Sequence, residues 1–365
     1  MKNYYADEFF LSANTVDGFY SLYDNLYYPE QNWFCYIIKG GPGTGKSTLM
    51  KKIAKKALEK GEKTEIIWCS SDPNSLDAVI LPNLKTAVVD GTAPHTMDPV
   101  FPGVSDTVIN LCDCWDEKTL KNSKNDIIKL CQKNGNLHKK SQNYLKAYKI
   151  IDDQNKMIFK NSIDFKNLSK YCEELLEKIF KEKSLTGLAH QALRFITSIT
   201  PKGVLSLNKT FDLKSSKIFV LEDSYFLLGN YVLKAIKEKA INLGYDIISC
   251  PSPFAPNSEL EALFIPELGI SFVLKNKNDC EEFIENSKCE CKKISLKKFI
   301  NKELIESHKN LLNFNNRICS EFLNEGIKYL SNALSIHDEI EKYYKSAMDY
   351  SKVNKIADNL ISAIL

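Results

Sequence analysis

The second half of this sequence repeats the first, with corresponding residues about 185 positions apart. Residues 10–22 correspond to residues 195–207, and the segment around Tyr144 corresponds to the segment around Tyr329. A chain of 365 residues is also long for a single hydrophobic core. Similarity that persists through loop, strand and helix predicts two copies of one structural unit.

Both copies share one predicted order of elements. The first half comprises residues 1–184 and the second half residues 185–365. Each begins with a short β segment and an α/β core, and ends in a helical arm, about 116–184 in the first half and about 296–365 in the second. In both arms apolar residues recur at helical spacing, which predicts an antiparallel helical hairpin in each. The alternating core predicts a doubly wound parallel sheet, with first-half elements at 33–39 (strand), 47–60 (helix), 64–69 (strand) and 86–90 (strand).

A glycine-rich loop separates the first long apolar strand from the helix that follows it. It matches the pattern G-x-x-x-x-G-K-[ST], which defines a P-loop. Glycines let the backbone N–H groups curl around a phosphate, and the positive end of the helix dipole faces the same anion. The predicted nucleotide-contacting residues are Gly40, Gly41, Pro42, Gly43, Thr44, Gly45, Lys46, Ser47 and Thr48.

Three side chains carry the chemistry expected of this loop. Lys46 is expected to neutralise the β- and γ-phosphates, and the Ser47 hydroxyl to bind Mg²⁺. A second carboxylate is expected at the end of a neighbouring apolar strand, where it holds the magnesium through water, and Asp90 fits that position. We therefore predict ATP and Mg²⁺ as ligands, with Ser47 and Asp90 on the metal side.

The second half has lost these groups while keeping its strand and helix pattern. In the alignment of the two halves, Lys46 corresponds to Gly229, and Asp90 corresponds to Leu274. The loop itself, residues 222–230, is acidic and bulky where a phosphate requires space. The predicted fold is therefore α/β, with two tandem P-loop NTPase-like lobes of which the second is degenerate.

Three other residues near the strand ends are candidates for catalysis. His95 and Asp98 lie in an irregular loop and could orient water or an acceptor hydroxyl, although a histidine beside a proline turn is more often a packing group. Asp72 could approach the γ-phosphate or simply cap a following helix. Arg194 is the better of only two arginines for completing the charge of the site, with Lys39 or a lysine from the other lobe as the alternative.

The composition of the chain limits the kinds of partner molecule and the cell compartment that we expect for it. The chain carries 49 basic and 46 acidic side chains, a balance that does not favour nucleic acid as a partner. Neither an N-terminal signal nor a membrane-spanning run is recognisable, so a cytoplasmic location is expected. The 11 cysteines agree with a reducing compartment, and their spacing does not match common zinc sites.

The combination of motifs resembles a family of uncharacterised, duplicated P-loop proteins of low-GC bacteria, described as ATPases or ATP-binding proteins. The resemblance covers nearly the whole chain and rests on five segments: residues 39–48, 69–73, 90–95, 98–103 and 200–203. It implies ATP binding at the first lobe. In similar proteins the second copy can also have an intact P-loop, from which this sequence departs.

The leading hypothesis is a Mg-dependent ATPase that uses only the first lobe and leaves the second a structural or regulatory role. One alternative is a small-molecule kinase, although residues 116–183 contain no arginine to clamp phosphates. Another is a non-catalytic ATP-sensing scaffold that holds a partner protein through its helical arms. The sequence does not decide the oligomeric state.

Overall fold

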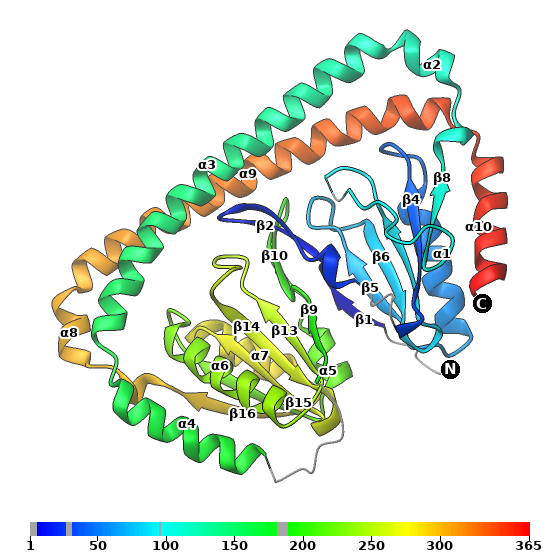
Figure 1. Ribbon diagram of the computed structural model, residues 1–365. Coiled ribbons are helices and arrows are strands. Elements are labelled where there is room, and N and C mark those ends of the chain that lie inside the picture. Colours follow the sequence, from blue (N-terminus) through cyan, green and yellow to red (C-terminus); the bar gives the residue numbers. More distant parts are fainter. Residues whose placement is uncertain (1–5, 27–30, 95, 181–188) are drawn as a thin grey trace.

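The computed structural model describes residues 6–26, 31–94, 96–180 and 189–365. Within these ranges the protein is a mixed α/β structure with three β-sheets and the helices α1 to α10 (Figure 1). Two six-stranded sheets, one from each half of the sequence, lie below a pair of long helices that spans both of them. The predicted α/β class is confirmed.

The first six-stranded sheet carries the glycine-rich loop at the end of its fifth strand in spatial order. The order is β1 (Asp7–Phe9), β5 (Glu65–Trp68), β6 (Leu76–Leu81), β7 (Thr86–Asp90), β4 (Phe34–Lys39) and β8 (Asp106–Asn110). The three strands predicted in this region are present within about one residue of their expected bounds. All neighbouring strands are parallel except β6, which runs antiparallel to both β5 and β7.

The expectation of a purely parallel sheet is therefore wrong. Only residues 69–75 connect β5 to β6, and only residues 82–85 connect β6 to β7. A parallel crossover needs a dozen or more residues, so connections this short allow only antiparallel neighbours. Because β6 folds back between β5 and β7, strands β7 and β4 still present their carboxyl ends at the same edge.

The second six-stranded sheet has the same strand order and the same strand directions as the first. In the corresponding order its strands are β9 (Gln191–Leu193), β13 (Ile247–Pro251), β14 (Leu260–Ile265), β15 (Ile270–Lys275), β12 (Lys217–Glu222) and β16 (Glu290–Ser295). Strand β14 runs antiparallel to both of its neighbours, as β6 does, and the other pairs are parallel.

The two halves join through a four-stranded sheet and a shared core. This sheet has the order β11 (Gly203–Ser206), β10 (Thr197–Thr200), β2 (Ser12–Thr15) and β3 (Gly18–Ser21), so its central strands come from different halves. Beside it, the N–H of Phe10 donates to the carbonyl of Phe195 and the N–H of Phe195 donates to that of Phe10, both at 2.9 Å. Both phenylalanines belong to one buried cluster that includes side chains of both six-stranded sheets. The lobes are therefore packed as one body.

The helices divide into those that cover the sheets and those that form the arms. The first group is α1 (Lys46–Glu59), α5 (Lys209–Lys214), α6 (Leu227–Asn242) and α7 (Lys277–Asn286). The second group is α2 (Glu117–Asn122), α3 (Lys124–Asn161), α4 (Phe165–Ile179), α8 (Lys302–Ser307), α9 (Lys309–Ala347) and α10 (Tyr350–Ile364).

The arms do not form a hairpin each, which corrects the prediction. Instead α3 and α9 pack antiparallel against each other along most of their length (Figure 1). Tyr144 stacks on Tyr329 with ring centroids 5.6 Å apart, and the Ser141 hydroxyl donates to the carbonyl of Gly326. Each of these pairs joins residues 185 positions apart. The short connections that follow α3 and α9 lead the chain to the opposite lobe, so neither helix turns back along itself.

The last helix of each arm packs on the lobe of the other half. Helix α4 contributes Leu168, Cys172 and Leu175 to the buried cluster around α6 of the second half. Helix α10 contributes Ala357 and Leu360 to the buried cluster around α1 of the first half. The second arm is consequently part of the wall around the glycine-rich loop.

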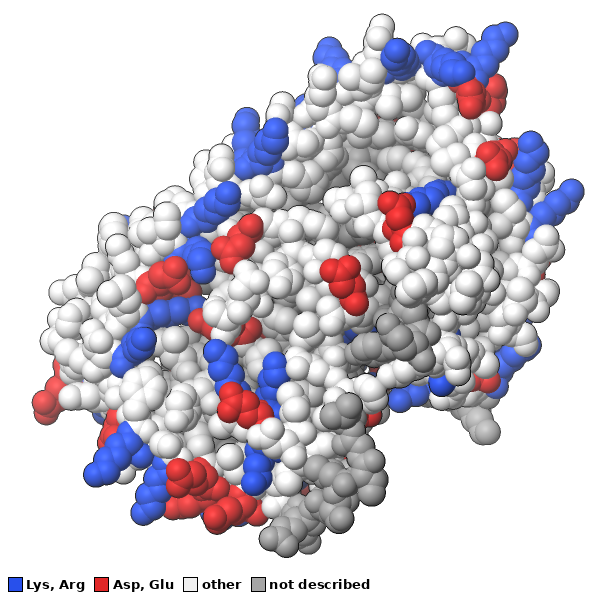
Figure 2. Space-filling view, in the orientation of Figure 1, with Lys and Arg blue, Asp and Glu red and all other residues white. Residues whose placement is uncertain are grey.

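The surface of the molecule mixes both signs of charge. On the face shown in Figure 2, lysines follow the α3/α9 pair, and carboxylates lie mostly over the lobes beside it and near its ends. Among the residues described, no helix combines the length and the apolar character needed to cross a membrane.

Candidate functional site

The glycine-rich loop connects β4 to α1 and takes a conformation that requires its glycines. Gly43 has φ of 70° and Gly45, the residue immediately before the helix, has φ of 96°. Residues with a side chain rarely adopt these backbone angles, whereas glycine does so without steric cost. The loop thereby leads directly into the amino end of α1, whose first N–H groups have no partner within the helix. This is the geometry of an anion-binding helix terminus.

Lys46 lies inside this loop and folds back over it. Its Nζ donates to the carbonyl oxygens of Gly40 at 2.6 Å and Gly41 at 2.8 Å. It is also 3.5 Å from Asp90 Oδ2, and both side chains are less than one fifth exposed. The ammonium is thus positioned by the loop that it would share with a phosphate.

Asp90 ends β7, the strand that lies beside β4, and is paired in register with Ile38. Its Oδ1 accepts a hydrogen bond from the N–H of Thr92 at 2.9 Å, which leaves Oδ2 directed toward Lys46. Thr92 also binds Gly40 twice, because its hydroxyl donates to the carbonyl and accepts from the N–H. Sequence reasoning missed Thr92, although its place two residues after a predicted carboxylate was a usable signal.

The residues predicted for magnesium are the hydroxyl of Ser47, directly after the lysine, and the carboxylate of Asp90, which lies near the lysine ammonium. Ser47 Oγ accepts a hydrogen bond from the N–H of Leu76 at 3.0 Å, so it is oriented by β6. Mg²⁺ bound with a nucleotide takes only one or two protein ligands and completes its shell with phosphate oxygens and water. Ser47 and Asp90 match that donor set. Among the described residues, no group of three or more His, Cys, Asp or Glu could hold a metal ion alone.

Two of the other predicted residues, Asp98 and Asp72, are engaged in contacts of their own loops. Asp98 is 86% exposed and forms an ion pair of 2.9 Å with Lys39, whose Nζ also donates to two backbone carbonyls of the same loop. Asp72 accepts hydrogen bonds from the N–H of Asn74 and the hydroxyl of Ser75, so it closes a turn rather than capping a helix. His95 lies outside the described residues.

The second arm covers the loop, which sequence reasoning did not foresee. The Tyr350 hydroxyl donates to the carbonyl of Gly43 at 2.9 Å. A Cβ on Gly41 would lie 2.6 Å from the ring of Tyr344, and one on Gly43 would lie 3.0 Å from Cγ of Lys345. The sequence signals only that aromatic residues recur at these positions, because Tyr344 corresponds to Phe159 in the first half. Glycines are therefore needed here for close approach as well as for backbone conformation.

Arg194 does not complete the site, which corrects that expectation. It is buried, its Nε donates to Glu65 Oε1, and its Nη1 donates to the carbonyl of Asn25 at 2.9 Å. The guanidinium is thus committed to an ion pair and a carbonyl at the junction of the halves. The other arginine, Arg317, lies exposed on α9 near the ring of Phe314.

The corresponding loop of the second half, residues 223–226, is closed by its own chain. Four residues connect β12 to α6, whereas six connect β4 to α1. Asp223 is buried, and its carboxylate accepts hydrogen bonds from the N–H groups of Gly229 at 2.9 Å and Tyr225 at 3.2 Å. Burial raises the pKa of Asp223, and these N–H donors act in the opposite direction. An internal carboxylate occupies the N–H groups that a phosphate would use.

A second buried carboxylate lies beside Asp90. Asp77 on β6 accepts a hydrogen bond from the Ser12 hydroxyl at 3.3 Å. Burial raises the pKa of the Tyr23 hydroxyl, and the carboxylates of Asp77 and Asp90 raise it further. Burial also raises the pKa of Cys69, with Asp77 again adding to the effect, so this thiol is not activated as a nucleophile. Asp77, Tyr23 and Cys69 therefore form a buried polar group close to Asp90.

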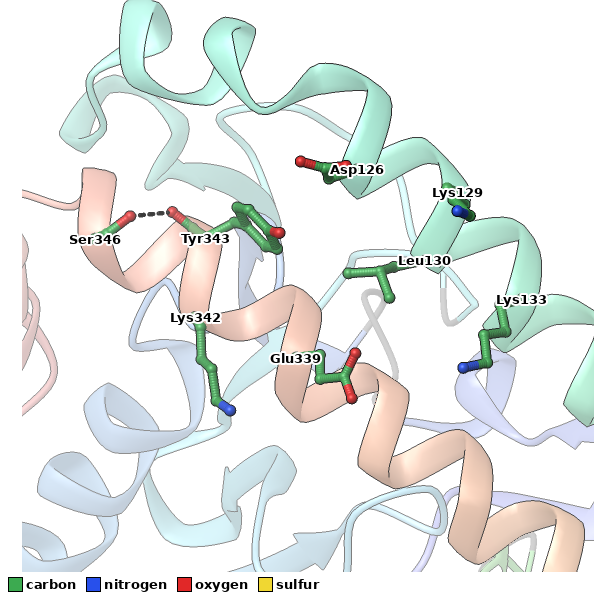
Figure 3. Close-up of a pocket in the computed structure, with 8 residues that line it drawn as sticks. All are labelled: Asp126, Lys129, Leu130, Lys133, Glu339, Lys342, Tyr343 and Ser346. Atoms are coloured by element: carbon green, nitrogen blue, oxygen red, sulfur yellow. Dashed lines mark hydrogen bonds between the residues drawn. The ribbon is translucent and has the colours of Figure 1, made fainter.

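A groove with a volume of about 670 Å³ lies between the two long helices. Figure 3 shows Tyr343 of α9 and Leu130 of α3 facing each other across it. The remaining lining residues are polar or charged: Asp126, Lys129, Lys133, Glu339, Lys342 and Ser346. The groove uses the face of α9 opposite to Tyr344 and Lys345, so it adjoins the loop only through that helix.

Comparisons with protein-family models, with curated proteins and with solved structures find no match to this chain. The functional argument therefore rests on the residues and geometry of the loop.

Proposed function

We propose that the protein binds Mg-ATP at the glycine-rich loop of its first half and hydrolyses it there. The observation that carries the proposal is the position of Lys46, whose ammonium lies between the loop carbonyls and the carboxylate of Asp90. A lysine beside a strand-end carboxylate at the start of a helix is the arrangement with which P-loop proteins hold a triphosphate and its magnesium. The resemblance to duplicated P-loop proteins of low-GC bacteria supports the same reading.

The residues of the site have distinct roles in this proposal. The N–H groups of the loop and of the first turn of α1 bind the phosphates. Lys46 leaves the carbonyls of Gly40 and Gly41 to contact the β- and γ-phosphates, and Ser47 and Asp90 hold Mg²⁺. Bound magnesium would neutralise charge on the phosphate oxygens. Catalysis is then mainly positioning and electrostatic stabilisation, as in other phosphoryl transfers.

We further propose that the two halves are copies of one P-loop unit that pack as an intramolecular pair, with an inactive second site. The equal strand order of the six-stranded sheets supports this proposal, as do the contacts between residues 185 positions apart. Asp223 and the shorter loop support the inactivity of the second half, because both remove the space and the N–H donors that a phosphate needs.

Nucleotide binding by the wild-type chain and by Lys46→Ala tests the proposal. We expect Mg-ATP to bind the wild type more tightly than Mg-GTP, and the variant to lose at least about a hundredfold in affinity, since an ion pair to phosphate is removed. Circular dichroism and thermal unfolding verify that the variant is folded. Equal affinity of wild type and variant would refute the assignment.

The contact between the second arm and the loop favours a second candidate function, an ATP-sensing scaffold. Nucleotide entry would act directly on Tyr350 and Tyr344, and through α9 on the groove between the long helices. Steady-state phosphate release separates the two functions: an ATPase releases phosphate from ATP without an acceptor, whereas a scaffold binds ATP tightly without turnover.

A further inference from the structure

The structure narrows the choice of the residue outside the loop that supplies positive charge to the terminal phosphate in the proposed site. Nucleotide hydrolases of this kind generally use a cation from outside the loop, most often an arginine. This chain has two arginines, and neither is placed for that role. Arg194 is held by Glu65 in the interior. Arg317 precedes Lys345 by 28 positions on the same helix, a separation of about 42 Å at 1.5 Å per residue.

Two lysines outside the loop approach it, and they differ in how firmly they are held. Lys39 Nζ donates to the carbonyls of Gly91 and Met97 and also to the carboxylate of Asp98. Withdrawing it would break three polar contacts at once. Lys345 is 54% exposed, and its ammonium pairs with Glu341 one turn earlier on the same helix. An exposed pair at this spacing contributes little to stability, so the ammonium can leave it at small cost.

The first part of the Lys345 side chain packs against the loop, whereas its ammonium is held by the exposed ion pair with Glu341. Its Cγ lies 3.0 Å from the place of a Cβ on Gly43, and the Glu341 carbonyl oxygen lies 3.1 Å from the same place. On the next helix, Tyr350 donates to the carbonyl of Gly43. Gly43 belongs to the loop whose N–H groups would cradle the phosphates, and Lys46 of the same loop would reach the β- and γ-phosphates. The side chain of Lys345 therefore starts beside the loop, on the phosphate-binding side of the proposed site.

We propose that Lys345, delivered by the arm of the second half, binds the terminal phosphate of ATP held in the loop of the first half. This proposal rests on the proposed function and adds the residue by which the site distinguishes a triphosphate from a diphosphate. It also relates the arms to the site. Lys345 belongs to the second half and the loop to the first, so the two halves must pack together before the site has its full positive charge. Nucleotide state and arm position are thereby linked.

The chain supplies a matched control at the corresponding position of the other arm. Lys160 is the counterpart of Lys345, and its neighbour Phe159 stacks on Tyr225 with ring centroids 3.8 Å apart. Lys160 thus follows a residue that packs on the second-half loop, where Asp223 accepts a hydrogen bond from the N–H of Gly229. Replacing Lys160 removes the same charge from the same type of helix position without approaching the first-half site.

Equilibrium titration with Mg-ATP and with Mg-ADP tests the proposal on the wild type, Lys345→Ala, Lys345→Arg and Lys160→Ala. We expect Lys345→Ala to weaken ATP binding about tenfold to a hundredfold and to change ADP binding less than about twofold, since one charged contact to the γ-phosphate is lost. Lys345→Arg should restore most of the preference for ATP, and Lys160→Ala should bind both nucleotides as the wild type does.

Three other results would overturn the proposal. Unchanged ATP affinity in Lys345→Ala would show that Lys345 does not contact the nucleotide. Equal weakening for ATP and ADP would show that Lys345 has a structural role only. The same loss in Lys160→Ala would show a nonspecific charge effect. None of the three refutes the proposed binding of ATP by the wild-type chain. A wild-type chain that binds neither nucleotide instead refutes the proposed function together with this inference.

Discussion

Lys46 Nζ lies 3.5 Å from Asp90 Oδ2, and the two corresponding positions of the second half also contact each other without any charge. Those positions hold Gly229 and Leu274, and a Cβ on Gly229 would lie 2.5 Å from Leu274 Cδ2. The register agrees, because Asp90 pairs with Ile38 while Leu274 pairs with Leu221. No lysine fits at Gly229 while Leu274 is present. Where one half has a polar pair, the other half has an apolar contact.

Asp90→Asn tests the role of this carboxylate. We expect the variant to bind ATP within about threefold of the wild type, because Lys46 and the loop N–H groups remain. Turnover should fall at least a hundredfold, since the amide supplies no charge to hold magnesium opposite the γ-phosphate. Single-turnover phosphate release over a magnesium titration measures both effects. Full activity of the variant would exclude Asp90 from the metal site.

Arg194→Met tests the assignment of Arg194 to the interior. Loss of the guanidinium leaves Glu65 buried without its partner, which costs about 3–5 kcal/mol in the free energy of unfolding. The double variant Arg194→Met with Glu65→Gln should recover much of that loss, because no unpaired charge remains. Urea denaturation gives the free energies. At temperatures where it is folded, the double variant should turn over ATP at the wild-type rate; a large loss would return Arg194 to the active site.

The two long helices approach each other closely at one glycine of α9, Gly326. A Cβ on Gly326 would lie 3.0 Å from Leu145 Cδ2, whereas a Cβ on Gly135 of α3 has open space around it. Gly326→Val should therefore destabilise the protein by about 1–3 kcal/mol through overpacking. Gly135→Ala is the matched control and should stabilise it by about 0.5–1 kcal/mol, because alanine favours the helix. Equal shifts in thermal unfolding for both variants would contradict the close approach of α3 and α9.

The sequence predicted those features that are set by local geometry. Lys46 and its loop follow from a motif in which glycine spacing and helix start determine the backbone, and Asp90 follows from its place at a strand end. The antiparallel direction of β6 was also accessible, because the connection through Asp72 is too short for a crossover. What these features share is that residues within a few positions of each other determine them.

The arrangement of the arms was not accessible in this way. The apolar face of a helix requires a partner but does not specify which one, so α3 could equally have packed within its own arm. The contact of Tyr350 with Gly43 joins residues 307 positions apart and depends on the exchange of helices between the halves. Similarly, the commitment of Arg194 depends on the buried Glu65 of the opposite half. Long-range pairing determines each of these features.

Glu261→Gln tests a buried acid whose effect on stability depends on pH. Glu261 on β14 corresponds to Asp77 on β6, and its Oε1 has no hydrogen-bond partner in the structure described. Burial raises the pKa of Glu261 to about 7, although Thr197 and Lys275 lower it somewhat. The folded state therefore holds the proton more tightly than the unfolded chain, in which a glutamate titrates near about 4.3.

The sign follows from this difference in proton affinity. Below about pH 4 both states are mostly protonated and ionisation of Glu261 costs almost nothing, whereas stability falls as the pH rises through 7, by about 3–4 kcal/mol in total. Glutamine keeps the shape without the charge. We expect Glu261→Gln to be more stable than the wild type by about 3–4 kcal/mol at pH 8 and nearly equal to it at pH 4, as measured by urea denaturation. Glu285→Gln on the exposed face of α7 should shift neither value, and a pH-independent difference for Glu261→Gln would show that the carboxyl is not the titrating group.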